Sequence, residues 1–471
     1  MGNLFLDGML GLAVGDALGV PHEFKPRAEL QAAPVTDMDG YGRYRQPKGT
    51  WSDDTSMALC CADSLCRGFD PDDMMKKFSA WLNRRQYTAG GVVFDVGRIC
   101  RLAIGKYDLG LEAELCGRRD ENGNGNGGLM RSYPVSLWRV LTAEAGLPDA
   151  QLLAPVHAAS ALTHAHACSL VCCGIYTLFI DEWLKRAQGD LPLDAARRAW
   201  KRAKAAYRDL GGDFAEEMEK PGKFNMPDVL AGLIQDEISS GGYVLDTLNA
   251  AFWCLFTTDD FASCVLRAVN LGGDTDTTAA VAGSLAGLVY GAESIPQRWL
   301  DVLCNRSLIE DISSKLNRSV CGAAENEEIC AFEGPHAHLA LKYGADVEVD
   351  GLHYKNAYAA WLAQGVQETY RDQFAWLNAH QARRLFKQLP QRPDWQDVQA
   401  QELFRVCQEK YKQNPALAEK LLATGDCAIV YDTTGAHDNR MGVCRCKACE
   451  AEAHKNLLGK TLMQVREALR L

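Results

Sequence analysis

Positive charge is in deficit in this sequence, which has 50 Lys and Arg against 61 Asp and Glu and a formal net charge of −11. A surface that binds nucleic acid mainly through its phosphates needs clustered Lys and Arg. The charge balance argues against such a surface as the main source of affinity. It is still compatible with a local basic cleft.

Long hydrophobic runs are also lacking. The N-terminus is apolar but has no basic stretch, and Asp7 and Asp16 interrupt it, so we expect no signal peptide. The other apolar runs, Ala250 to Phe256 and Thr278 to Val289, fall short of the roughly 20 residues that a membrane span needs. We therefore expect a soluble, cytoplasmic protein with no membrane partner.

Cysteine, in contrast, is plentiful. Without a secretory leader, the 18 cysteines are expected to be thiols in a reducing cytosol rather than a disulfide framework. The apolar share of 47% and the charged share of 24% are typical of globular proteins. Because a single core stops growing near roughly 250 to 300 residues, a chain of 471 residues predicts two domains.

Strand-like alternation is almost absent from the first two thirds of the chain, where apolar residues recur at three- and four-residue spacing and predict a succession of helices. Residues 317–335 lose this periodicity and collect Gly, Asn and Glu, as a linker does. Beyond them, 346–354 alternates like a strand and 428–431 predicts another. The sequence thus predicts an all-α domain at residues 1–318 and a smaller α+β domain at residues 330–471.

Two short segments, 51–55 (WSDDT) and 272–277 (GGDTDT), each open a predicted helix and present carboxylates with hydroxyl groups. N-capping and the helix dipole would explain one such helix start. Four Asp at two helix starts are more than those effects require, and the Gly pair of the second segment would let the backbone approach a ligand. Since oxygen ligands suit Mg²⁺, Mn²⁺ or Ca²⁺, the segments predict a site for such a cation.

A Gly-rich loop at 122–128 (NGNGNGG) is followed by Arg131. Such loops are often only turns, but their backbone N–H groups, beside a fixed arginine, can also bind a phosphate. His164 and His166 add titratable groups in a helical stretch, where a lone histidine is more often structural than catalytic.

In combination, these segments resemble the ADP-ribosylglycohydrolase family over about residues 5 to 300. The similarity rests on Gly11 to Gly19 with Glu23, Ser52 to Thr55, Gly127 to Pro134, Thr163-His164, Gly242 to Thr247 and Gly272 to Thr278. It implies an all-α fold and a site for two Mg²⁺ ions, which Mn²⁺ can replace. The ligand positions that it implies are filled by Ser52, Asp53, Asp54, Asp274, Asp276 and Thr277.

The resemblance also implies an activity, the hydrolysis of an N- or O-glycosidic bond. ADP-ribose would be released from an ADP-ribosylated protein, at arginine or serine, or from guanine in nucleic acid. Glu23, Asp54 or Asp276 would take a proton from the attacking water. The substrate would be bound by Gly123, Gly125, Gly127, Gly128, Met130 and His164. Such an enzyme would reverse an ADP-ribosyltransferase, as a toxin antidote or in a conflict with phage.

The C-terminal part resembles a second family, NADAR, whose domains are associated with NAD and ADP-ribose, over about residues 335 to 471. The similarity rests on Val347 to Tyr354, Lys410 to Pro415, Leu421 to Gly425, Asp438 to Gly442 and His454 to Arg466. The family includes N-glycosidases. An α+β fold and a site for ADP-ribose or a modified base are therefore implied for this part.

This part departs from its family at two carboxylates. Where the family has two Glu, the sequence has Tyr358 and Tyr431. An N-glycosidase needs carboxylates to stabilise an oxocarbenium-like transition state and to activate water, so the change argues against catalysis unless Asp432 or Asp438 takes their place. Ligand binding would then fall to Tyr358, Tyr431, Asp438 and Asn456.

A cysteine-rich pattern lies within the same part. Cys444, Cys446, Cys449 and His454 form C-x-C-x2-C-x4-H, which offers enough soft ligands for a tetrahedral Zn²⁺ site, although spacing alone does not establish a metal. Two other function classes stay open for the whole chain. One is a non-catalytic protein that binds ADP-ribose or NAD, and the other is an N-glycosidase of a small nucleotide metabolite. The sequence does not indicate an oligomeric state.

Overall fold

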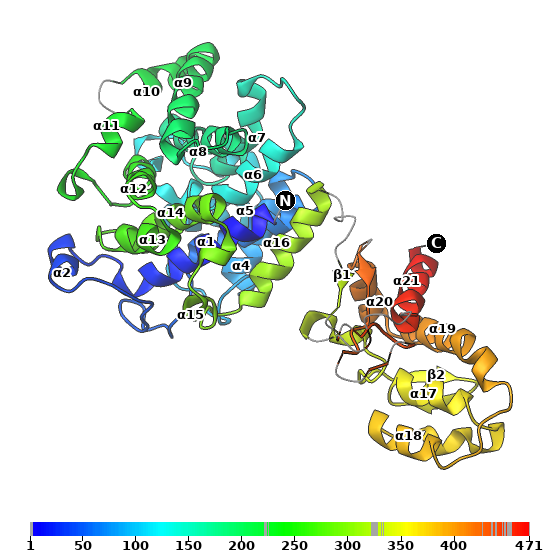
Figure 1. Cartoon of the computed structure of the whole chain (residues 1–471). Coiled ribbons are helices and arrows are strands. Elements are labelled where there is room, and N and C mark those ends of the chain that lie inside the picture. The colour runs from blue at the N-terminus through cyan, green and yellow to red at the C-terminus, as the bar shows by residue number, and fades with distance from the viewer. Residues whose placement is uncertain are drawn as a thin grey trace. The chain divides into compact units, whose positions relative to one another are not determined.

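The computed structural model describes residues 3–220, 224, 226–321, 328–330, 332, 334–425, 427–434, 437–438, 440–444, 446, 449 and 455–470. The chain divides into two compact units, Met1–Gly322 and Ala323–Leu471 (Figure 1). Much of the predicted linker lies outside the described residues, so the predicted domain limits stay predictions. The last helix of the first unit runs to Cys321, past the limit predicted at 318.

The first unit is built of helices joined by loops and short 3₁₀ turns. These helices are α1 (Leu4–Gly19), α2 (Arg27–Ala32), α3 (Asp53–Leu65), α4 (Pro71–Arg84), α5 (Arg98–Asp108), α6 (Ser132–Thr142), α7 (Asp149–Ala161), α8 (Ala167–Leu184), α9 (Pro192–Leu210), α10 (Gly212–Glu219), α11 (Pro227–Ala231), α12 (Val244–Phe256), α13 (Phe261–Val269), α14 (Thr275–Tyr290), α15 (Gln297–Leu300) and α16 (Arg306–Cys321). The predicted all-α fold is confirmed.

Two helical segments of this unit are apolar on all sides. Leu4–His22, which contains α1, and α8 are long and apolar enough to cross a membrane by length and composition. However, 83% and 78% of their apolar windows are buried inside the unit. A helix that is hydrophobic all round suits the interior of a large protein as well as a membrane. Both segments contribute to the core of this unit.

α1 and α14 pack against each other in the first unit (Figure 1). Glycine allows the close approach, since a Cβ atom at Gly11 would lie only 2.1 Å from the carbonyl oxygen of Gly283. The contact continues to the end of α1, where the Thr275 hydroxyl donates to the carbonyl oxygen of Gly19 at 2.8 Å. The first turn of α14 is therefore held against the last turn of α1.

A partly buried histidine of α7 gives this unit a predicted sensitivity to acid. Burial lowers the pKa of His157 to about 4, and its Nε2 lies 2.9 Å from the Tyr207 hydroxyl. In the unfolded chain the pKa returns to about 6.5, so between these values the unfolded state binds more protons. The stabilisation is complete above about pH 6.5 and declines by about 2 to 3 kcal/mol as the pH falls to about 4.

Urea unfolding of wild type and His157→Gln, at about pH 7.5 and about pH 4.5, tests this prediction. The variant should show a smaller loss of unfolding free energy on acidification, because its side chain does not titrate. His380→Gln is the control, since His380 is exposed in the second unit. Equal acid sensitivity in wild type and His157→Gln would contradict the assignment.

The second unit combines short strands with helices. β2 (Val347–Val349) and β3 (Leu352–Tyr354) form an antiparallel hairpin, and β1 (Glu328–Ile329) pairs in parallel with β4 (Ala428–Ile429). At the hairpin turn, Asp350 and Gly351 have φ angles of 52° and 76°, as a type I′ turn requires. The helices are α17 (Ala357–Gln364), α18 (Ala379–Phe386), α19 (Trp395–Gln413), α20 (Pro415–Leu422) and α21 (Leu457–Arg470). The predicted α+β fold is confirmed.

Candidate functional site

Two groups of carboxylates come together in the first unit. Oxygens of Asp16, Asp54 and Asp276 lie within 4.8 Å of one another. Oxygens of Glu23, Asp95 and Asp276 form a second group within the same distance. Asp54 and Asp276 lie in the first turns of α3 and α14, so the two predicted segments meet here. Asp276 belongs to both groups.

Asp16, near the end of α1, holds the start of α3. Its buried carboxylate accepts hydrogen bonds from the backbone N–H of Ser52 at 2.9 Å and from the backbone N–H and hydroxyl of Thr55 at 3.1 and 2.6 Å. Burial raises the pKa of Asp16 to about 6, and these hydrogen bonds oppose the rise. The hydroxyl of Ser52, a predicted metal ligand, accepts the backbone N–H of Asp54 at 3.3 Å as the N-cap of α3.

The start of α14 is tied to its surroundings through Asp274 and Thr277. The Asn126 side-chain amide donates to Asp274 Oδ2 at 2.9 Å, and the Thr277 hydroxyl donates to Asp54 Oδ1 at 3.2 Å. Gly273 has a φ of 73°, and a Cβ atom there would lie 2.4 Å from the carbonyl oxygen of Ser240. Position 273 thus requires glycine because its backbone is left-handed and because it packs against Ser240. The sequence had suggested a different reason, the approach of the backbone to a ligand.

The carboxylates of this cluster are buried beside one another. The exposed fractions of Asp53, Asp54 and Asp276 are 6%, 0% and 1%, and burial first, then the neighbouring carboxylates, raise the pKa of each well above its usual range. One oxygen each of Asp54, Asp276 and Glu23 is buried with no hydrogen-bond partner among the described residues. A hard divalent cation takes such oxygens as ligands, so the cluster fits one.

A cavity of about 680 Å³ adjoins the cluster, within the range of small-molecule sites. Its lining includes the predicted residues Glu23, Asp53, Gly125, Gly127, Met130, His164, Asp274 and Thr277. The remaining predicted residues of this unit are buried without lining it, namely Ser52, Asp54, Gly123, Gly128 and Asp276. Most of the predicted site residues of this unit thus line one cavity.

Known proteins match both units. The ADP-ribosylglycohydrolase family model matches residues 3–326. This chain belongs to the ADP-ribosylglycohydrolase family. The NADAR domain model matches residues 336–470, so the second unit contains a NADAR domain.

Named relatives match most of the first unit, which is called the hydrolase unit from here on. The ADP-ribosylarginine hydrolase Tri1 of Serratia proteamaculans is 32% identical over 317 residues, which cover 65% of this chain and 77% of Tri1. The ADP-ribosyl-[dinitrogen reductase] glycohydrolase of Rhodospirillum rubrum is 34% identical over 302 residues, or 63% and 89% of the two chains. A solved structure titled ADP-ribosylglycohydrolase-related protein complex is 34% identical, with a TM-score of 0.52. The match covers 68% of this chain and 98% of the chain in that structure. Accordingly, this chain is a hydrolase of glycosidic bonds to ADP-ribose.

The Gly-rich loop of this ADP-ribosylglycohydrolase packs tightly onto His164. A Cβ atom at Gly127 would lie 2.7 Å from Cε1 of His164, and one at Gly128 would lie 2.3 Å from the Ser160 hydroxyl. Burial lowers the pKa of His164 to about 3, and the charge of Arg131 acts in the same direction. His164 therefore faces the cavity as a neutral imidazole.

Arg131 has a structural role, contrary to the expectation that it would help the loop to bind phosphate. It is 1% exposed, and its guanidinium donates to the Thr163 hydroxyl at 2.8 Å and to the carbonyl oxygen of Gly127. It thereby ties the loop to the residues after α7. The arginines that line the cavity are instead Arg98 and Arg118, which the sequence analysis did not select.

Asp95 and Tyr44 also belong to the site, although neither was predicted from the sequence. Asp95 lies outside regular secondary structure with a φ of 43°, and burial raises its pKa. The Tyr44 hydroxyl lies beside Glu23 and Asp95, and burial together with these two carboxyl groups raises its pKa. Burial and the charge of Asp95 raise the pKa of Glu23 to about 8. Neither Asp95 nor Tyr44 lies in a recognisable motif, so the sequence carried no signal for them.

In the NADAR domain, the predicted tyrosines are near neighbours. Burial raises the pKa of Tyr358, the charge of Arg383 opposes this, and Tyr431 and Asp438 add to it. Tyr431 stacks on Phe332 with ring centroids 5.0 Å apart. Tyr358, Tyr431 and Asp438 therefore lie in one region of the domain.

Asn456, the fourth residue predicted to bind ligand in this domain, is engaged by backbone. Its Nδ2 donates to the carbonyl oxygen of Ile429 at 2.9 Å, and its Oδ1 accepts the N–H of Tyr431 at 3.1 Å. These bonds join the end of β4 to the residues before α21. The contacts give Asn456 a structural role, and ligand binding by it stays a prediction.

Proposed function

We propose that this ADP-ribosylglycohydrolase uses divalent metal ions, with Mg²⁺ preferred, to release ADP-ribose from modified arginine side chains of a protein. The observation that carries the proposal is the pair of carboxylate groups that share Asp276 beside the cavity. The arginine linkage is supported by two relatives named ADP-ribosylarginine hydrolase, at 32% and 31% identity. It is also supported by Asp95, which lines the cavity and whose carboxylate would suit a guanidinium leaving group.

The metal ions would be held by side chains at the starts of α3 and α14. The residues proposed to hold them are Asp53, Asp54, Asp274, Asp276 and Thr277, with Ser52 and Asp16 fixing the start of α3. Mn²⁺ would serve in place of Mg²⁺, because both prefer oxygen ligands. Bound there, the metal would supply Lewis-acid polarisation and lower the pKa of a bound water.

Glu23 is proposed as the group that takes the proton from the attacking water. It lines the cavity, whereas Asp54 and Asp276, the other two candidates, are buried beneath it and hold negative charge for the metal. The diphosphate of ADP-ribose would lie near Arg98 and Arg118, the arginines of the cavity lining. In this proposal the NADAR domain binds an ADP-ribose conjugate through Tyr358 and Tyr431.

Release of free ADP-ribose from arginine, serine and guanine conjugates, in Mg²⁺ or EDTA, tests the proposal with the full-length chain. Mg²⁺-dependent release from arginine, absent in the Asp274→Ala/Asp276→Ala variant, is expected. Release from no conjugate would favour a binding protein. Guanine release that survives in the double variant would place a catalytic site in the NADAR domain.

A further inference from the structure

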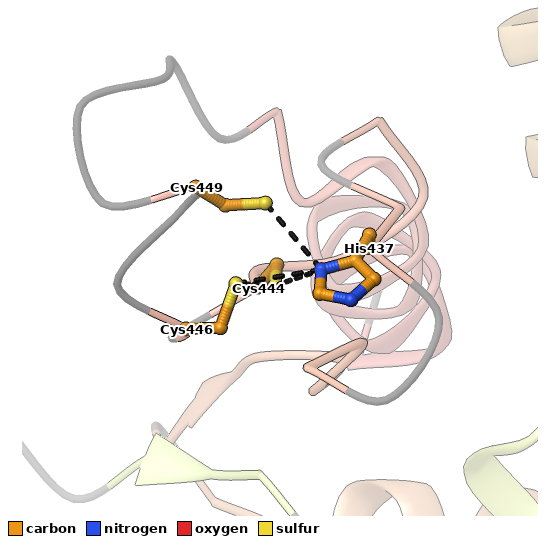
Figure 2. Close-up of side chains that lie close together, drawn as sticks. All are labelled: His437, Cys444, Cys446 and Cys449. Carbon is orange, nitrogen blue, oxygen red and sulfur yellow. Dashed lines mark hydrogen bonds between the residues drawn. The ribbon is translucent and has the colours of Figure 1, made fainter.

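Four potential metal ligands converge in the NADAR domain, in the segment between β4 and α21. Figure 2 shows the sulfurs of Cys444, Cys446 and Cys449 pointing at the ring of His437. The three sulfurs lie 3.5, 3.4 and 3.6 Å from the same atom, His437 Nδ1. All four atoms lie within 4.8 Å of one another.

Hydrogen bonds alone do not account for this arrangement. A neutral imidazole nitrogen has one lone pair in the plane of the ring, so Nδ1 accepts one thiol proton, not three. The sulfurs of Cys444 and Cys446 are 3.4 Å apart as well, and Cys444 is fully buried. Cys444 Sγ also lies 3.7 Å from the carbonyl oxygen of Thr434. Hydrogen bonds to Nδ1 therefore explain at most one of the three short sulfur–nitrogen distances.

A zinc ion at the centre explains the distances. Tetrahedral bonds of about 2.3 Å to sulfur and about 2.05 Å to nitrogen place sulfur about 3.6 Å from nitrogen and about 3.8 Å from another sulfur. The three sulfur–nitrogen distances, 3.4 to 3.6 Å, match that value. The sulfur–sulfur distance of 3.4 Å is slightly shorter than expected.

We propose that His437, Cys444, Cys446 and Cys449 form a structural Zn²⁺ site. Three thiolates and one imidazole complete a tetrahedral shell with no open position, which is typical of structural rather than catalytic zinc. The histidine of this site is His437, which precedes the cysteines, whereas His454, which the spacing suggested, lies outside the described residues. The backbone N–H of Cys449 donates to the carbonyl oxygen of Cys446 at 3.0 Å, which holds these two cysteines close together.

The zinc site would stabilise two stretches of chain that pair through backbone hydrogen bonds. The N–H of Val443 donates to the carbonyl oxygen of Tyr431 at 2.8 Å, and the N–H of Thr433 donates to that of Val443 at 3.0 Å. The zinc would cross-link the two stretches that these bonds pair, one with His437 and one with the cysteines. It would thereby fix the segment that carries Tyr431 and Asp438, in a domain whose sheets have only two short strands each within the described residues.

Metal analysis of the full-length protein, produced with zinc in the medium and purified without chelator, tests this site. We expect about one zinc per chain, and loss of about nine tenths of it in Cys446→Ser/Cys449→Ser. His437→Gln should lose zinc to EDTA much faster than wild type. Two controls should keep the zinc, Asp274→Ala/Asp276→Ala in the hydrolase unit and His454→Gln.

Because a cysteine variant can lose metal by unfolding, the wild-type protein is also exchanged with Co²⁺. A thiolate-to-metal charge-transfer band with intense visible bands is expected of tetrahedral cobalt bound to cysteine. Absence of zinc from wild type, or a cobalt spectrum without the charge-transfer band, would overturn the proposal. So would zinc that is lost in His454→Gln and kept in His437→Gln.

Discussion

Replacing Asp276 by asparagine should lower the rate of ADP-ribose release by about a hundred- to a thousandfold. Asp276 contributes to both carboxylate groups, so the change weakens the whole proposed metal site at once. Asparagine has nearly the same shape, which confines the change to charge and metal affinity. Several kcal/mol of transition-state stabilisation by a metal corresponds to a loss of this size. Steady-state release of ADP-ribose in saturating Mg²⁺ measures it.

The fold should tolerate this change. In EDTA, Asp276→Asn should unfold at the same temperature as wild type or higher, because it removes one of several repelling buried carboxylates. Added Mg²⁺ should raise the unfolding temperature of wild type much more than that of the variant. Asp260→Asn is the matched control, since the exposed Asp260 caps α13 by accepting the N–H of Ser263, and asparagine caps as well. Wild-type activity in Asp276→Asn would show that the cluster is not the catalytic site.

The two acidic segments were predictable because each is local. Asp53 and Asp54 are adjacent at one helix start, and Asp274 and Asp276 are separated only by Thr275 at the other, so carboxylates and hydroxyls are visible together in the sequence. Asp16 and Asp95 join them through the fold: Asp16 lies within an apolar helix, and Asp95 lies in a loop without a motif. Their contribution depends on how α1, α3 and α14 pack, which hydrophobic spacing does not specify.

Arginines and histidines show the same limit. In the sequence, Arg131 is the cation nearest the Gly-rich loop. In the structure its guanidinium is buried and donates hydrogen bonds to backbone carbonyl groups and to the Thr163 hydroxyl. Arg98 and Arg118 line the cavity without any pattern around them. In the NADAR domain, spacing favoured His454, which lies outside the described residues, whereas His437, with a φ of 52°, lies beside the cysteines. The sequence shows which residue types could bind a ligand. It does not show which arginine or histidine of the chain lies at the site.

The close packing of α1 against α14 does correspond to a pattern in the sequence. Glycines lie four residues apart at Gly11 and Gly15, and again at Gly283 and Gly287. A side chain at Gly283 would meet the carbonyl oxygen of Gly11 at 2.2 Å, and backbone cannot yield as a flexible side chain can.

Gly283→Val should therefore destabilise the hydrolase unit by at least about 3 kcal/mol and abolish ADP-ribose release, because separating the helices moves Asp276 away from Asp16. Thermal unfolding and the release assay measure both effects. The control is Gly105→Ala in α5, where the added Cβ meets nothing within 4 Å and helix propensity favours alanine by about 0.5 to 1 kcal/mol. If Gly283→Val unfolded at the wild-type temperature, the close crossing would not be what brings the starts of α3 and α14 to one cation site.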